Sequence, residues 1–118
     1  MFLIETVPER LLFTSSIAIG ELRAGALEQR DPVYRERLLQ WPDDAVIPQF
    51  GERTLPVTLA VGDRWGRIRG ESARRGLTLP VTDALIAATA LVHGLIVVTR
   101  NEEDFRRCGV AVRNPWTE

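Results

Sequence analysis

Three acidic residues and one amide in this chain have side chains that could together bind a cation. They are Glu21, Asp83, Asn101 and Asp104. Carboxylate and amide oxygens are the ligands that hard divalent cations such as Mg²⁺ and Mn²⁺ prefer in proteins. Such an ion can orient a phosphodiester, activate a bound water and stabilise the leaving oxygen. If the four side chains converge, the chemistry that they predict is metal-assisted hydrolysis of a phosphodiester.

Each of these residues also has a simpler structural interpretation. Asp83 falls in the first turn of a predicted helix, where a carboxylate interacts favourably with the helix dipole by up to about 1 kcal/mol. Asn101 and Asp104 have the spacing of a capping box. Glu21 falls on the apolar face of its predicted helix, where a carboxylate is costly unless it is paired or binds a metal. It could instead hydrogen-bond a loop or an arginine, so both interpretations stay open at each position.

No other group of residues in the sequence predicts a competing reaction. His93, the one histidine, falls at a helix end away from any partner in the sequence, and Cys108 has neither His nor Lys nearby. One His and one Cys exclude a zinc site of the Cys/His type. A glycine-rich phosphate loop is also absent, because the glycines of the middle region are spread along one helix: Gly62, Gly66, Gly70 and Gly76.

The composition indicates a single globular domain, with 118 residues, 45% hydrophobic residues and a net charge of −1. All fifteen basic residues are arginine. Arginine suits phosphate and carboxylate, although a biased genomic composition would give the same result. The near-neutral charge argues against nucleic-acid binding by bulk electrostatics, but a local basic face is compatible with it. A lone cysteine, with neither a membrane-spanning run nor a signal core, leads us to expect a soluble cytoplasmic protein.

The segment that carries three of the four candidate residues predicts a helix followed by a buried strand. Thr82 and Asp83 open the helix, and Gly94 ends it. The apolar run 95–98 predicts a strand covered on both faces, after which Asn101 can cap a short helix. A helix leading into such a strand is half of an α/β parallel-sheet unit. Polar groups just past the carboxyl end of the strand fall where open α/β sheets bind their ligands.

The long helix after Thr58 has two distinct faces. Thr58 caps it, and it runs through Arg75 to a stop at Gly76. We expect its inward side to carry Leu59, Trp65, Ile68 and Ser72. The other side carries Arg64, Arg67, Glu71, Arg74 and Arg75.

The remaining elements are predicted from caps and apolar spacing. They are the last turns of a helix over residues 1–7, a strand at 11–14, a helix at about 17–27 capped by Ser15 or Ser16, a helix at 33–41 started by Asp31 and Pro32, an edge strand at 53–57 and a strand at 110–113. In the 33–41 helix the core candidates are Leu38, Leu39 and Trp41, and Pro42 should kink or end it.

Four motifs in their order and spacing resemble the PIN-domain ribonucleases of the VapC toxin group, near its FitB-like branch. The motifs are Ser16-Ile-Ala-Ile-Gly-Glu-Leu-Arg-Ala-Gly25, Leu79-Pro-Val-Thr-Asp-Ala-Leu-Ile-Ala-Ala-Thr-Ala90, Val97-Val-Thr-Arg-Asn-Glu-Glu-Asp-Phe105 and Asn114-Pro-Trp116. The resemblance covers nearly the whole chain. It implies an α/β fold, a three-layer α/β/α PIN-like domain over residues 1–118 with a mostly parallel sheet.

The resemblance also assigns roles to the candidate residues. It implies an endoribonuclease that depends on Mg²⁺ or Mn²⁺, with Asp83 as the central metal ligand and Glu21 as the acidic residue of a Glu-Leu motif. The fourth acidic position of the family falls on Asn101, or on Asp104 one helical turn later. Because Asn101 is neutral, Asp104 would supply the charge. Thr99 would lie beside the same site.

One departure from the family pattern is at the amino end. Proteins of this group begin with a strand that ends in Leu-Asp-Thr-Asn, whose Asp is a metal ligand, and no segment here has that motif. On this interpretation the first strand is missing, either through a wrong start or because the chain is a natural truncated relative. With fewer anionic ligands, we expect weak Mg²⁺ binding and poor RNA cleavage unless another chain donates a carboxylate.

The leading hypothesis is therefore a VapC-like ribonuclease toxin of a type II toxin–antitoxin system, which the resemblance implies forms a homodimer. RNA would approach along Arg64, Arg67, Arg74 and Arg75, although this face could equally be a solvated surface. A VapB-like antitoxin would bind near the cleft and place a basic side chain against the carboxylates. The rival hypothesis is a non-catalytic PIN remnant that binds the antitoxin or assembles with itself.

Overall fold

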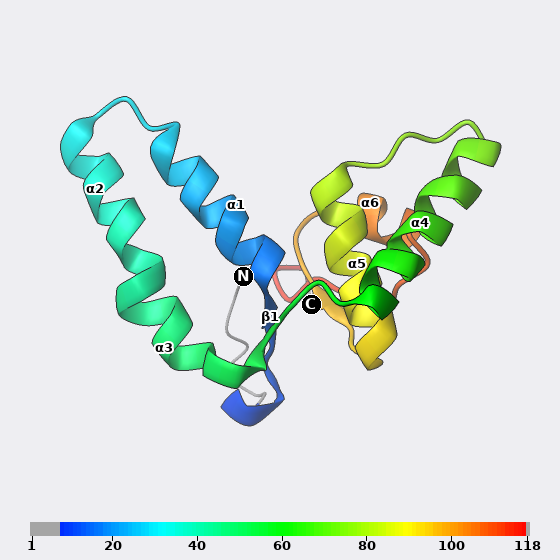
Figure 1. The fold of residues 1–118 in the computed structure, drawn as a ribbon, viewed down its shortest axis with the longest axis horizontal. Coiled ribbons are helices and arrows are strands. Elements are labelled where there is room, and N and C mark those ends of the chain that lie inside the picture. The colour runs from blue at the N-terminus through cyan, green and yellow to red at the C-terminus, as the bar shows by residue number, and fades with distance from the viewer. Residues whose placement is uncertain (1–7, 118) are drawn as a thin grey trace. The chain divides into compact units, whose positions relative to one another are not determined.

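The structure, a computed structural model, describes residues 8–117, so the helix predicted for residues 1–7 lies outside it. The described residues form two compact units, Pro8–Pro56 and residues 57–117. Each unit combines helices with one pair of short parallel strands (Figure 1). Parallel pairing agrees with the predicted α/β class. Within the described residues no helix is long and apolar enough to cross a membrane.

The Pro8–Pro56 unit is a set of consecutive helices framed by two strands. Its elements are η1 (Glu9–Leu11), β1 (Thr14–Ser15), α1 (Ser16–Leu27), α2 (Pro32–Trp41), the π-helical turn η2 (Pro42–Val46), α3 (Ile47–Phe50), η3 (Gly51–Arg53) and β2 (Thr54–Leu55). The strands pair with Thr14 opposite Thr54. Both predicted caps form: Ser15 Oγ accepts from the Ala18 amide at 3.0 Å, and Asp31 Oδ1 from that of Val33 at 3.0 Å. Local capping chemistry therefore starts both α1 and α2.

Arg23 of α1 connects this helix to α2 and to the π-helical turn that follows α2. Its guanidinium donates to the Leu39 carbonyl at 2.6 Å and forms an ion pair with Asp43 at 2.5 Å. The hydrogen bond from Arg23 lowers the pKa of Asp43 below its ordinary value. The buried residues of this unit include Ala26, Val46 and Phe50. One arginine thus links the two long helices of the unit.

For this unit, the structure contradicts one prediction and confirms another. Trp41, a predicted core residue, is 45% exposed, whereas Leu38 and Leu39 are partly buried. As predicted, α2 ends before Pro42, and the chain continues through a π-helical turn into α3. Proline lacks an amide hydrogen and its ring crowds the preceding turn, and a wider turn relieves both problems.

The unit over residues 57–117 contains the larger core. Its elements are α4 (Leu59–Arg74), α5 (Val81–His93), β3 (Val97–Val98), α6 (Glu102–Arg107) and β4 (Val112–Arg113). Helix α4 packs along α5, and α6 lies beside α5 and β4 (Figure 1). The strands β3 and β4 pair in parallel, with Val97 opposite Val112. The core comprises Val61, Ile68, Leu79, Ala84, Ala87, Ala88, Ala90, Val97, Phe105, Cys108 and Val110.

The turns that bound these helices follow the sequence signals. Thr58 Oγ1 accepts from the Val61 amide at 3.2 Å and caps α4. Gly76 and Gly94, which follow α4 and α5, have φ angles of 73° and 66°. Such left-handed backbone favours glycine because it has no Cβ. The start of α4 and the ends of α4 and α5 therefore lie where the sequence predicts them.

Two apolar residues of this unit lie where the sequence did not predict them. Leu59 is 90% exposed, because the inward position of the first turn of α4 belongs to Val61, which is fully buried. Trp65, Ile68 and Ser72 do face inward, as predicted. Ile96 is 59% exposed, so the 95–98 segment is not covered on both faces.

Candidate active site

The unit over residues 57–117 brings three of the four candidate residues together. The side-chain amide of Asn101 donates to Asp104 Oδ2 at 3.0 Å and to Asp83 Oδ2 at 3.4 Å. Asp83 comes from the first turn of α5, and Asp104 from the first turn of α6. Two carboxylates therefore share one amide donor where the two helices begin.

Asn101 does not act as a cap in this arrangement. It precedes α6, but its side chain accepts no hydrogen bond from that helix and instead donates to the carboxylates. The Asn101 backbone amide donates to Thr99 Oγ1 at 3.0 Å, which holds the turn after β3. The predicted capping box of Asn101 and Asp104 therefore does not form, although the two side chains are hydrogen-bonded to each other.

The end of the chain supports α6 from the other side. Asn114, which is buried, donates to Glu102 Oε2 at 3.1 Å, and its Oδ1 accepts from the Trp116 amide at 3.1 Å. The Trp116 ring in turn stacks against Arg100, with the guanidinium carbon 4.6 Å from the ring centroid. Sequence reasoning gave Asn114 no role, and its only signal was its place in the Asn-Pro-Trp motif.

Cys108, which follows α6, lies near the two carboxylates. Its thiol is buried and donates to the backbone carbonyl of Asp104 at 3.3 Å. Burial raises the pKa of Cys108, and the negative charges of Asp83 and then Asp104 raise it further. Both carboxylates are therefore close enough to act on the thiol electrostatically, a relationship that the sequence did not suggest.

Glu21 belongs to the Pro8–Pro56 unit, on helix α1. It is exposed, so the expectation that it faces an apolar core is wrong, and the cost of burying a carboxylate does not apply to it. The buried residue of α1 is Ala26. That Glu21 joins the same site as Asp83 stays a prediction from the family resemblance.

The donor atoms near Asn101 fit Mg²⁺ or Mn²⁺ in kind. Asp83 and Asp104 supply hard carboxylate oxygens, and Asn101 could supply its amide oxygen. The shared amide donor partly offsets the repulsion between the two carboxylates, which a divalent cation would also reduce. Among residues 8–117, no group of three or more His, Cys, Asp or Glu side chains converges as a metal site would. The donor set is therefore suitable in chemistry, with two carboxylates bridged by the Asn101 amide.

The predicted basic face of α4 is exposed along its length. Arg67 pairs with Asp63 at 2.9 Å, and Arg74 with Glu71 at 3.1 Å, both within the helix. Arg64 and Arg75 are also exposed. Exposed pairs of this kind contribute about 0–1 kcal/mol, so they leave the arginines available to a stronger anion.

Comparisons with known proteins show the family to which this chain is similar. The PIN domain model matches residues 2–110. The toxin FitB of Neisseria gonorrhoeae is 35% identical over 109 residues, which cover 89% of this chain and 76% of FitB. The tRNA(fMet)-specific endonuclease VapC of Shigella flexneri is 36% identical over 105 residues, or 87% of this chain and 74% of that protein. The crystal structure of FitAcB from Neisseria gonorrhoeae superposes with a TM-score of 0.87 at 30% identity, covering 97% of this chain and 82% of that one.

Proposed function

This chain belongs to the PIN-domain family, and from that premise we propose that it is a VapC-like toxin that hydrolyses RNA phosphodiester bonds with the help of Mg²⁺ or Mn²⁺. The observation that carries the proposal is the pair of carboxylates, Asp83 and Asp104, held around the Asn101 amide. The similarity to a toxin and to a tRNA endonuclease supports the choice of RNA as substrate.

Asp83 and Asp104 would hold the ion, and the family resemblance adds Glu21 to them. When bound, a divalent ion supplies an activated water and stabilises charge on the leaving oxygen. The protein orients the carboxylates through Asn101, and it orients Asn101 through Thr99. Phe105 of α6 and Cys108, which follows this helix, are buried in the core and anchor α6 to it.

The proposed macromolecular partners are RNA and a cognate antitoxin. The arginines of α4 can contact RNA phosphates, and an RNA substrate implies action in the cytoplasm. A basic side chain of the antitoxin could donate to the acceptor atoms that Asn101 now uses, Asp83 Oδ2 and Asp104 Oδ2. Such a contact would block metal binding and cleavage together.

The direct test is cleavage of a structured RNA by the purified chain in MnCl₂, with an EDTA control. We expect weak Mn²⁺-dependent cleavage that Asp83→Asn abolishes. Asp63→Asn is the matched control, because Asp63 is an exposed aspartate of the same unit that pairs with Arg67 on its own helix. Cleavage that persists in the Asp83→Asn protein would point to a contaminant or to a different site.

The rival hypothesis, a non-catalytic module, predicts the same fold without any Mn²⁺-dependent cleavage. If the chain co-purifies with the cognate antitoxin but cleaves no RNA with any divalent metal ion, the non-catalytic hypothesis is supported.

A further inference from the structure

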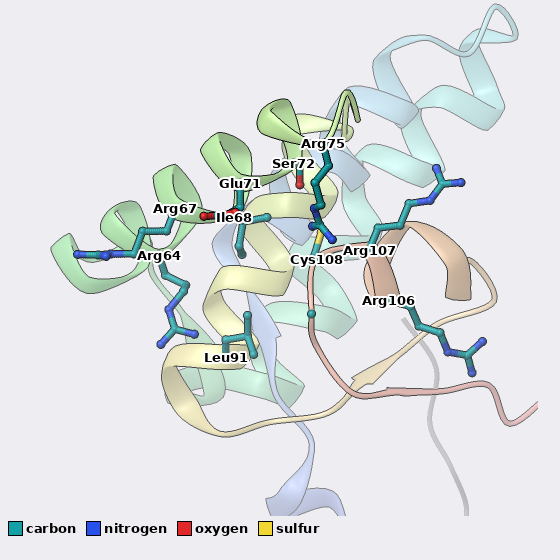
Figure 2. A pocket seen from close by; sticks show the side chains of 11 residues that line it. Arg64, Arg67, Ile68, Glu71, Ser72, Arg75, Leu91, Arg106, Arg107 and Cys108 are labelled. Carbon is teal, nitrogen blue, oxygen red and sulfur yellow. The ribbon is translucent and has the colours of Figure 1, made fainter.

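A second candidate site lies between helices α4, α5 and α6, entirely within the unit over residues 57–117. It is an open pocket of about 380 Å³ (Figure 2). Five arginines line it, from α4 and its end and from α6: Arg64, Arg67, Arg75, Arg106 and Arg107. Glu71 is the one acidic residue in the lining, and it already pairs with Arg74 outside it. The pocket is thus strongly positive.

The arginines of this pocket differ in how far their charge is compensated. Arg67, Arg106 and Arg107 each pair with a carboxylate on their own helix, and none of those carboxylates lines the pocket. For Arg64 and Arg75 the structure gives no acidic partner within residues 8–117. Figure 2 shows the Arg75 side chain reaching inward toward Cys108. These two guanidinium groups are the natural contacts for an incoming anion.

Ser72 gives the pocket a neutral hydrogen-bond donor. Its side chain is 2% exposed, and its hydroxyl has no hydrogen-bond partner among the described residues. Figure 2 shows that hydroxyl on the pocket side of α4. A buried hydroxyl without a partner destabilises the protein, so a ligand oxygen that accepts from it would remove this penalty.

The pocket also has apolar walls, formed by Ile68, Leu91 and Cys108. A bare phosphate needs no such surface and would leave most of the volume empty, whereas a nucleotide offers a flat base as well as an anionic group. Bases stack on apolar side chains and on guanidinium planes. Cys108 connects this pocket with the candidate active site, because its thiol donates to the Asp104 carbonyl at 3.3 Å.

We propose that this pocket binds a phosphorylated nucleotide, with the phosphate on Arg64, Arg75 and Ser72 and the base on the apolar wall. The source is either the RNA strand, held next to the cleavage site, or a free nucleotide. As far as the strand is the source, the proposal rests on the proposed nuclease function. The site itself is separate from the Asp83 and Asp104 carboxylates.

The test is a calorimetric titration of the full chain, in EDTA and with Asp83→Asn so that nothing is cleaved. The probes are 5′-AMP, adenosine, inorganic phosphate and a 5′-phosphorylated tetra-adenylate. We expect 5′-AMP to bind, adenosine not to bind, and Ser72→Ala or Arg75→Gln to weaken 5′-AMP about tenfold, as the loss of a charge-assisted hydrogen bond predicts. Arg69→Gln is the control, because Arg69 lies on α4 over the Trp65 ring, outside the pocket.

The outcomes separate the possibilities. If the tetra-adenylate loses affinity in the same variants, the RNA strand is the source, and if only 5′-AMP does, a free nucleotide is. If inorganic phosphate binds as tightly as 5′-AMP, the pocket does not recognise a nucleotide. If the affinity for 5′-AMP is the same in all pocket variants, 5′-AMP does not bind in this pocket. Ser72→Ala should not lower the melting temperature, because it removes an unsatisfied hydroxyl, whereas a merely structural Ser72 would lower it. Asp83-dependent cleavage without 5′-AMP binding would leave the nuclease standing and refute this pocket alone.

Discussion

Asn101 and Asp83 lie 18 residues apart in the sequence, and the amide nitrogen of Asn101 is 3.4 Å from Oδ2 of Asp83. The same amide is 3.0 Å from Oδ2 of Asp104. A neutral donor therefore separates two carboxylates that would otherwise repel each other. Where the family resemblance leads one to expect a further acidic residue, this chain has a group that stabilises the site without a metal.

This relationship predicts the effect of Asn101→Asp. Replacing the donor with a third carboxylate should lower the melting temperature in EDTA, with a loss of stability of about 1 kcal/mol, because the site is exposed and partly screened. MnCl₂ should recover more than this loss, since a third anionic ligand strengthens divalent binding. Thermal denaturation with and without MnCl₂ measures both effects.

The control for that experiment is Asn101→Ala, which removes the amide and adds no charge. It should destabilise the protein in EDTA but gain little from MnCl₂. An equal Mn²⁺-dependent gain in the wild-type, Asn101→Ala and Asn101→Asp proteins would mean that the ion binds elsewhere.

The assignment of Glu21 can be tested by a pair of variants on and beside helix α1. If Glu21 belongs to the metal site, Glu21→Gln should reduce both the Mn²⁺-dependent rise in melting temperature and the rate of RNA cleavage, the latter by about a hundredfold or more. Glu28→Gln, an exposed glutamate that follows the same helix, should change neither. Equal effects of the two substitutions would remove Glu21 from the site.

Much of the fold was predictable because local chemistry determines it. Ser15, Asp31 and Thr58 cap their helices through side-chain oxygens, and Gly94 ends α5 in a left-handed conformation. Each of these signals depends only on neighbours within a few residues. Predictions of this kind were confirmed in both units.

The burial of single residues was less predictable, because it depends on segments distant in the sequence. Leu59 and Val61 are both apolar residues of the first turn of α4, but only Val61 meets the packed face of α5. Ile96 is apolar like its neighbours, and nothing in its own segment says which face of the strand stays open. Helical and strand periodicities give one face but not what covers it.

The candidate site shows the same division. The positions of Asp83 and Asp104 followed from helix starts, whereas the Asn101 bridge and the Asn114 support form only when distant segments pack together. A hydrogen bond between side chains from different elements leaves no periodic signal in one sequence. The arginine pocket was visible only as a basic helix face, because its other wall comes from α6.

Homodimerisation, which the family resemblance implies, is a further expected outcome. Leu59 and Ile96 are 90% and 59% exposed, and apolar side chains of this size are often covered by association. We expect sedimentation velocity at micromolar concentration to give the mass of a dimer. A monodisperse monomer under those conditions would contradict the prediction.

Asn114 provides a prediction about stability. Asn114→Ala removes the bond to Glu102 and the bond from the Trp116 amide at a buried position. Because both partners lose a hydrogen bond near the interior, we expect a loss of about 1–3 kcal/mol in urea unfolding. Thr117→Ala removes only a bond from an exposed hydroxyl to the Asn114 carbonyl and should cost far less.

Cys108, the chain's single cysteine, reports on the site through its pH dependence. Burial and then the charges of Asp83 and Asp104 raise its pKa in the folded protein. A raised thiol pKa means that the folded state holds its proton more tightly than the unfolded state. The stabilisation is therefore complete below the unfolded-state pKa of about 8.5, and it is lost as the pH rises through the folded-state pKa.

Alkylation by iodoacetamide measures this directly, because only the thiolate reacts. Between pH 8 and 9 the native protein should react at least about tenfold more slowly than the urea-unfolded chain, since its thiol is both protonated and buried. Asp104→Asn removes one of the charges that raise the pKa, so the midpoint of the alkylation profile should shift to lower pH. Asp63→Asn, distant from Cys108 in the sequence and paired with Arg67, should leave that midpoint unchanged. An identical shift in both variants would show that the carboxylates beside Asn101 do not act on the thiol.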